Sequence, residues 1–168
     1  GLVTKDGSGN TSTFSNLEPL SPAGNAANWS VTAIGEYIFN LNGSNYIAGG
    51  SSFAAPTVTG VAALIKEKYP WMDGSLIRQT ILSTATDIGN SGVDSTYGWG
   101  LLNSDKAVNG PSLFSKTLAL GNNVTLDVTA GTYTFSNNIS GDAGVIKNGE
   151  GTLILSGNST FSGVTTVN

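Results

Sequence analysis

The chain has 168 residues, a length that suits one ordinary domain or two small ones. Seven basic and eleven acidic residues give a formal net charge of -4, and no Lys/Arg cluster occurs, so nucleic acid is not expected as a partner. The sequence has no cysteine and no histidine, which excludes disulfides, thiolate metal sites and the usual proton shuttle at neutral pH. We therefore expect no metal and no cofactor.

The first 50 residues mix short apolar runs with turn formers. The runs at 30–34 and 37–39 predict short strands linked by loops. No basic stretch followed by an apolar one opens the chain, so no signal peptide is predicted. The longest uncharged stretch, 47–65, is broken by Gly, Ser, Thr and Pro residues, which argues against a transmembrane helix.

A helix is predicted to begin at Ser52. Apolar residues cover all its sides up to the charges at 66–68, so we expect it to be buried until its last turn, which Pro70 ends. Asp73 and Ser75 are candidate caps for a second, amphipathic helix over about 76–84, and a turn-rich stretch follows at 87–96.

The dipeptide Gly110-Pro111 marks a plausible domain boundary. Beyond it, alternating strands are predicted at 124–128, 132–135 and 152–155, separated by Gly, Asn and Ser turns. Short strands at this spacing suit a β-solenoid, in which each coil needs neighbours to cover it. We therefore expect the natural protein to continue past residue 168.

The chemistry of the chain centres on Gly50, Ser51 and Ser52. Ser52 stands between a glycine-rich turn and a helix, whose first N–H groups lack intrahelical partners and can stabilise an oxyanion beside the Ser52 hydroxyl. Gly49 and Gly50 leave room for a substrate to approach. The alternative is that Ser52 only caps the helix, which an isolated Gly-x-Ser in this context would favour.

The stretch 50–64, GSSFAAPTVTGVAAL, resembles the serine-region signature of the subtilisin family, roughly Gly-Thr-Ser-x-Ala-x-Pro-x-Val-x-Gly-x-x-Ala-Leu. This resemblance implies that Ser52 is the nucleophile, with Gly50 and Ser51 as backbone support for the oxyanion. Ser51 replaces the usual Thr and keeps a hydroxyl. Further segments resemble the family in the same order along the chain. They lie upstream at 13–16 and 20–24, and downstream at 69–71, 76–82, 85–87 and 97–108. The resemblance covers about residues 1–108 and implies an α/β fold, the C-terminal portion of a subtilisin-like domain with a mainly parallel sheet.

In that family the catalytic Asp, the His base and the oxyanion-hole Asn precede this region, and a chain without histidine cannot supply the base. Gly9-Asn10 imitates the oxyanion pair, but its distance from 13–16 places it in a later loop, so we interpret Asn10 as a turn residue. We expect this chain alone to be inactive. Without the upstream strands, the apolar surface of the Ser52 helix should be largely exposed. Four carboxylates in turn-like or capping contexts are interpreted as solvated rather than catalytic: Asp6, Asp73, Asp87 and Asp94.

Residues 144–168 resemble the passenger-associated strand repeat of bacterial autotransporters, in a single copy. Its pattern predicts that Leu153 and Leu155 point inward, while Thr and Asn side chains point outward or stack. A generic Gly-rich β-meander remains an open alternative.

These features predict two segments: 1–110, the C-terminal part of a subtilisin-like peptidase domain, and 111–168, the start of an all-β passenger. The resemblance implies a parent serine endopeptidase, extracellular or at the bacterial cell surface in association with the outer membrane. Its partners would be peptide or protein substrates, the upstream part of the catalytic domain and a C-terminal outer-membrane translocator. The alternative is that the parent is an inactive structural or adhesive passenger. Asp and His triad motifs upstream of this chain would argue for the protease, and their absence for the passenger. A Gly-x-Ser-x-Gly esterase is disfavoured because Ala54 takes the second glycine position.

Overall fold

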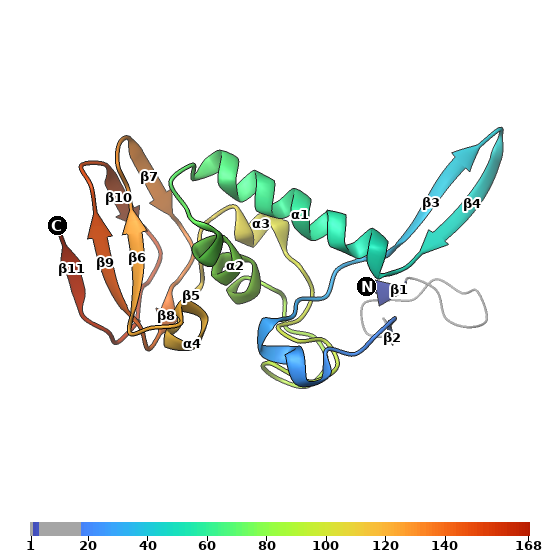
Figure 1. Ribbon diagram of the computed structural model, residues 1–168, viewed down its shortest axis with the longest axis horizontal. Coiled ribbons are helices and arrows are strands. Elements are labelled where there is room, and N and C mark those ends of the chain that lie inside the picture. The colour runs from blue at the N-terminus through green and yellow to red at the C-terminus, as the bar shows by residue number, and fades with distance from the viewer. Residues whose placement is uncertain (1, 4–17) are drawn as a thin grey trace. The chain divides into compact units, whose positions relative to one another are not determined.

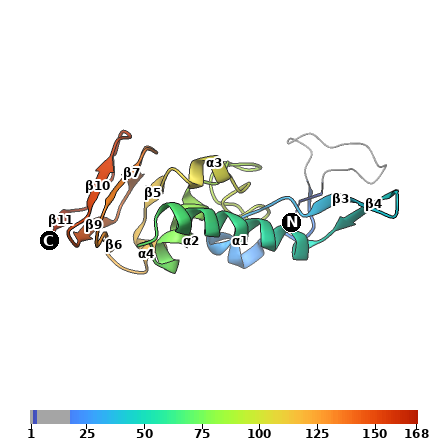
Figure 2. The same cartoon turned by 90° about the horizontal axis from the view of Figure 1, so that it is seen from above.

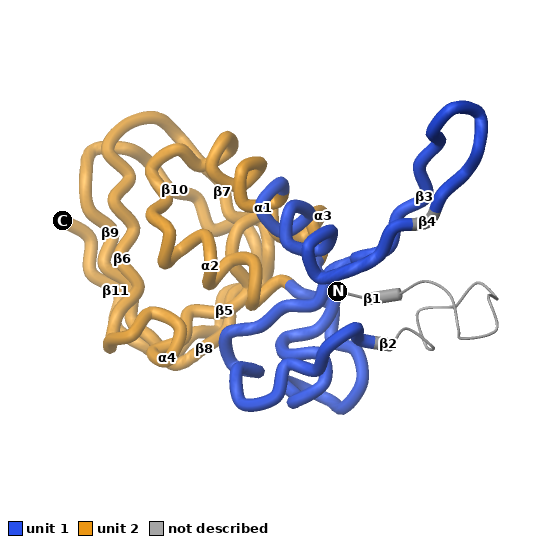
Figure 3. Tube along the Cα trace, turned by 45° about the vertical axis from the view of Figure 1, so that its right-hand side comes forward, with its two compact units in different colours: residues 1–60, 85–102 blue, residues 61–84, 103–168 orange. Residues whose placement is uncertain are grey.

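The computed structural model describes residues 2–3 and 18–168, which fall into two compact units (Figure 3). Unit 1 comprises 1–60 and 85–102, and unit 2 comprises 61–84 and 103–168. The units do not divide at the predicted boundary at 110/111, which stays a prediction about where the two sequence segments meet. Asp6, Asn10 and the segment 13–16 lie outside the described residues.

The described part of unit 1 contains two antiparallel strand pairs and a 3-10 helix, η2 (Gly24–Trp29). Strand β1 (Leu2–Val3) pairs with β2 (Glu18–Pro19), and β3 (Glu36–Leu41) forms a hairpin with β4 (Ser44–Gly49) (Figure 1). At the hairpin turn Asn42 and Gly43 have φ values of 53° and 81°, the left-handed conformation that tight hairpins favour.

The strand predicted at 30–34 is wrong. This segment forms only isolated bridges, at Thr32, which pairs in parallel with Leu101, and at Ile34. Gly98 and Gly100, which flank Trp99 just before Leu101, have φ values of 65° and 105°. These conformations bend the segment 98–101, so it cannot form a longer ladder with the residues around Thr32.

Helix α1 (Ser51–Lys68) begins in unit 1 and ends in unit 2. It begins one residue before Ser52, its predicted start, and ends two residues before Pro70. The expectation that it is buried until its last turn is wrong for this chain: Phe53 is 41% and Leu64 48% exposed. A helix with apolar residues all round is buried only where other elements cover it.

Three further helices lie in unit 2, and each begins with a side-chain cap. They are α2 (Gly74–Ser83), α3 (Ser104–Ala107) and α4 (Lys116–Ala119). Their caps are Asp73, Asn103 and Ser115, which accept hydrogen bonds from the N–H groups of Leu76, Lys106 and Leu118 at 2.7, 2.9 and 3.4 Å. The predicted second helix is thus confirmed, with its start two residues earlier.

The strands of unit 2 all pair in parallel (Figures 1 and 2), so a mixed α/β class with parallel strands is confirmed. These parallel strands lie at 113–167, whereas the strand pairs described within 1–110 are antiparallel. Val124 lies opposite Val145, and Val145 opposite Thr165, so successive partners are 21 and then 20 residues apart. The three predicted strands are present, and four more accompany them. The groups are β5 (Leu113–Phe114) with β8 (Ser140–Gly141); β6 (Asn123–Asp127), β9 (Gly144–Asn148) and β11 (Thr165–Val167); and β7 (Thr132–Phe135) with β10 (Thr152–Leu155).

The core of unit 2 draws on both sides of residue 110. Its largest fully buried side chains include Tyr69, Phe114, Leu118, Phe135 and Ile139. At the outer strand β10 the predicted inward pattern holds less well. Leu153 is half-buried, but Leu155 is 37% exposed, because β10 has a strand partner, β7, on one side only. In the described part of the chain no helix has the length and apolarity to cross a bilayer.

Candidate active site

The turn before α1 is tied to the start of the β3–β4 hairpin. The Gly50 N–H donates to the Gly35 carbonyl at 2.7 Å, and the Gly50 carbonyl accepts from the N–H groups of Phe53 and Ala54 at 3.0 and 3.3 Å. Ser51 and Ser52 follow as the first two residues of α1, and both are exposed. The local fold therefore presents Ser52 on the surface at the N-terminal end of a helix.

The surroundings of Ser52 suit a developing negative charge. N–H groups in the first turn have no intrahelical partner and carry the positive end of the helix dipole. The Ser52 hydroxyl itself makes no hydrogen bond to the described residues. Of the nearby backbone donors, those of Gly50, Phe53 and Ala54 are engaged, which leaves the N–H groups of Ser51 and Ser52 to meet an oxyanion formed beside the hydroxyl.

A second connection holds the hairpin to α1, and no sequence pattern predicts it. The Tyr37 hydroxyl lies 2.5 Å from the Thr57 hydroxyl and donates to the Ile34 carbonyl at 3.3 Å. The Tyr37 ring also lies 6.3 Å from the ring of Phe53, the residue after Ser52. Tyr37 and Thr57 are 20 residues apart, so no local pattern links them. Together they position the first two turns of the Ser52 helix.

The described carboxylates named above serve turns and caps, as interpreted from the sequence. Asp73 caps α2. Asp87 accepts from the Gly92 N–H at 2.8 Å, and Asp94 accepts from the N–H groups of Thr96 and Tyr97 at 2.7 and 2.8 Å. Among the residues with described positions, no group of three or more His, Cys, Asp or Glu side chains could hold a metal ion.

Comparison with known proteins gives two family matches. The subtilase family model matches residues 1–100, and the passenger-associated-transport-repeat model matches residues 145–168. The autotransporter lipoprotein NalP of Neisseria meningitidis serogroup B is 45% identical over 156 residues, which cover 89% of this chain and 14% of that protein.

Two further relatives extend the comparison. An extracellular serine protease of Serratia marcescens is 35% identical over 196 residues, covering 98% of this chain and 18% of that protein. Subtilisin DY of Bacillus licheniformis is 38% identical over 95 residues, covering 55% of this chain and 34% of that protein. The chain thus spans less than a fifth of the Neisseria and Serratia relatives. Since the family match covers more than half of the chain and includes the Ser52 turn, the chain belongs to the subtilase family.

Proposed function

We propose that this chain is part of a serine endopeptidase in which Ser52 is the nucleophile. The observation that carries the proposal is the position of Ser52 in the first turn of α1, two residues after the anchored Gly50, within the segment that matches the subtilase family. In the parent protein the Ser52 Oγ attacks the scissile carbonyl carbon and forms an acyl-enzyme. The Ser52 N–H, with the backbone at Gly50 and Ser51, supports the oxyanion.

The base and the orienting carboxylate of such an enzyme come from outside residues 1–168. The chain contains no histidine, and the described Asp73, Asp87 and Asp94 are engaged in caps and turns. A serine hydroxyl without a base is a poor nucleophile at neutral pH. Residues 1–168 alone should therefore be inactive, although they carry the nucleophile.

For residues 111–168 we assign the start of a β-solenoid passenger that follows the peptidase segment 1–110. The parallel partners 21 and 20 residues apart support a coil of that length. A ladder of stacked side chains adds support: the Asn148 amide donates to Asp127 at 2.7 Å, and the Asn168 amide donates to Asn148 at 2.8 Å. The names of the relatives, an autotransporter lipoprotein and an extracellular protease, favour a secreted or outer-membrane-associated parent that acts on peptides or proteins and has a C-terminal translocator.

A fluorophosphonate probe, which reacts with activated serines, tests the proposal. The parent protein should be labelled and should cleave a denatured protein substrate, and Ser52→Ala should abolish both without unfolding the domain. Ser44→Ala, an exposed serine in β4, is the matched control and should keep both. A folded parent that is neither labelled nor active would instead indicate a structural or adhesive passenger. Ser52-dependent cleavage by residues 1–168 alone would refute the expected inactivity.

A further inference from the structure

The segment after α1 buries aromatic surface against the parallel strands of unit 2. Tyr69 and Phe135 are fully buried, and their ring centroids lie 5.2 Å apart in an edge-on arrangement. Trp71 reaches the same strand, β7, with its ring 5.9 Å from that of Tyr133 and 5.9 Å from that of Phe135. Two aromatic residues of the peptidase segment thus cover one side of β7.

The Tyr69 hydroxyl also satisfies the backbone of β7 on the side away from its strand partner. The carbonyls of Gly131 and Phe135 accept hydrogen bonds from Thr152 and Ser156, on the side of β10. The Thr134 carbonyl accepts instead from the Tyr69 hydroxyl at 2.8 Å. An edge strand presents unpaired backbone groups, and here a tyrosine takes the place of a neighbouring strand.

Side chains of helix α2 likewise pair with backbone groups on either side of β5. The Ser83 hydroxyl accepts from the Ser112 N–H at 3.1 Å, just before β5. The side-chain amide oxygen of Gln79 accepts from the Ser115 N–H at 3.4 Å, just after β5. The Gln79 side chain is only 1% exposed. Arg78 adds a hydrogen bond to a carbonyl of α4, that of Leu118, at 2.8 Å. Three polar side chains of one helix therefore pair with backbone groups at the start of the strand stack.

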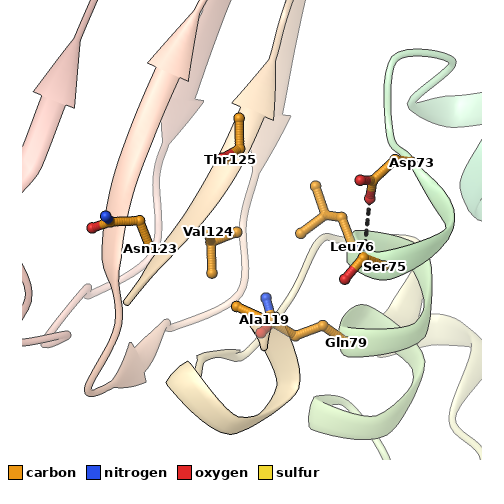
Figure 4. A pocket seen from close by; sticks show the side chains of 8 residues that line it. All are labelled: Asp73, Ser75, Leu76, Gln79, Ala119, Asn123, Val124 and Thr125. Atoms are coloured by element: carbon orange, nitrogen blue, oxygen red, sulfur yellow. Dashed lines mark hydrogen bonds between the residues drawn. The ribbon is translucent and has the colours of Figure 1, made fainter. Parts of the chain in front are cut away.

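Towards β6 the cover is looser. Leu76 of α2 and Val124 of β6 are each 4% exposed, and both line a pocket of about 220 Å³ together with Gln79 and Thr125 (Figure 4). Figure 4 shows Leu76 and Val124 on opposite sides of this pocket, one on the helix and one on the strand. Helix α2 thus faces β6 across a partly polar gap, while its firm contacts are to β5 and α4.

We propose that residues 69–83, the turn with Tyr69 and Trp71 followed by α2, form a docking surface that caps the strand stack. Its partner is the first coil of the stack in the same chain, residues 109–136. Stacked coils need a cap because each coil without one leaves apolar surface and backbone groups uncovered. The parallel strands of the passenger therefore depend on the peptidase segment for their stability. This inference does not involve the hydroxyl of Ser52, so it can fail or hold independently of the proposed catalysis.

Amide hydrogen exchange on the purified full chain tests the cap. Tyr69→Phe keeps the ring and removes the hydroxyl, and it should speed exchange in β7 and also in β10, which Tyr69 does not contact through a hydrogen bond. Loss of a buried hydrogen bond corresponds to a change of roughly 5- to 30-fold in the exchange rate when exchange follows opening of the whole stack. Tyr46→Phe, which removes an exposed hydroxyl from β4, is the control and should change neither strand.

A second variant keeps the test decisive should the first fail to fold. Ser83→Ala removes the acceptor for the Ser112 N–H and should speed exchange in β5 and in its partner β8. Exchange that changes only at residues 69–72 and 134 in the first variant would overturn the proposal. So would unchanged exchange in β8 in the second, because the cap would then have no effect beyond its own contacts.

Discussion

Replacing Gly110 by alanine tests whether the predicted boundary is a linker or part of the core. Gly110 is buried with a φ of 95°, and its carbonyl accepts a hydrogen bond from the Asn137 side chain at 2.5 Å. A methyl group there would lie 2.5 Å from Cδ1 and 2.7 Å from Cγ of Phe135, a side chain that is itself fully buried. The ring or the backbone must therefore move.

Two costs add at this position. A residue with a side chain destabilises the folded state by about 1 to 2 kcal/mol when its backbone lies in the left-handed region. Overpacking a core costs about 1 to 3 kcal/mol more. We expect Gly110→Ala to lower the free energy of unfolding by about 2 to 5 kcal/mol. For a protein of this size that corresponds to a fall in Tm of roughly 4 to 20 °C.

Gly121→Ala is the matched control. Gly121 is exposed, has no positive φ, and no atom lies within 4 Å of an added Cβ. Its substitution should change stability by less than about 0.5 kcal/mol. Thermal melts followed by circular dichroism, with urea titrations, compare the two variants. Equal melting temperatures would refute the packing of Gly110 against Phe135 and favour a flexible linker at 109–111.

Two further predictions concern unit 2. Asp73→Ala removes the cap of α2 and should cost about 1 kcal/mol in a urea titration, whereas Glu150→Ala, in an exposed turn, should cost nothing measurable; equal midpoints would argue against the cap. Burial raises the pKa of Tyr69 from 10.0 to about 12, so folding favours the neutral hydroxyl. The resulting stabilisation is complete below pH 10 and is lost as the pH rises towards 12. Tyr69→Phe should melt with a weaker pH dependence over that interval, and an unchanged dependence would count against the shifted pKa.

The features that the sequence predicted well depend on near neighbours. Asp73 caps a helix that starts at the next residue, and Pro70 follows the end of α1. The alternation at 132–135 and 152–155 marks strands of the same bounds. Burial and pairing depend on distant segments instead. Leu155 has the inward pattern but is exposed because no strand covers the far side of β10. Strand β9 lies in a Gly-rich stretch whose local pattern does not predict a strand.

The candidate site divides in the same way. Ser52 could be found because a long motif surrounds it within consecutive residues. Tyr37 could not, because its role depends on the hairpin returning the chain to Thr57 and Phe53 on α1.

A change of sequence pattern need not mark a gap in the core. At Gly110-Pro111 helical periodicity gives way to strand alternation, yet both residues are buried and the Asn109 carbonyl accepts from the Ser136 N–H at 3.0 Å. The physical reason is that the elements on both sides have surfaces to cover. Helix α2 must bury Leu76 and Leu82, and residues 109–136 must cover the edges of β5 and β7. Each supplies what the other lacks, so two segments with different patterns share one core across the point where the pattern changes.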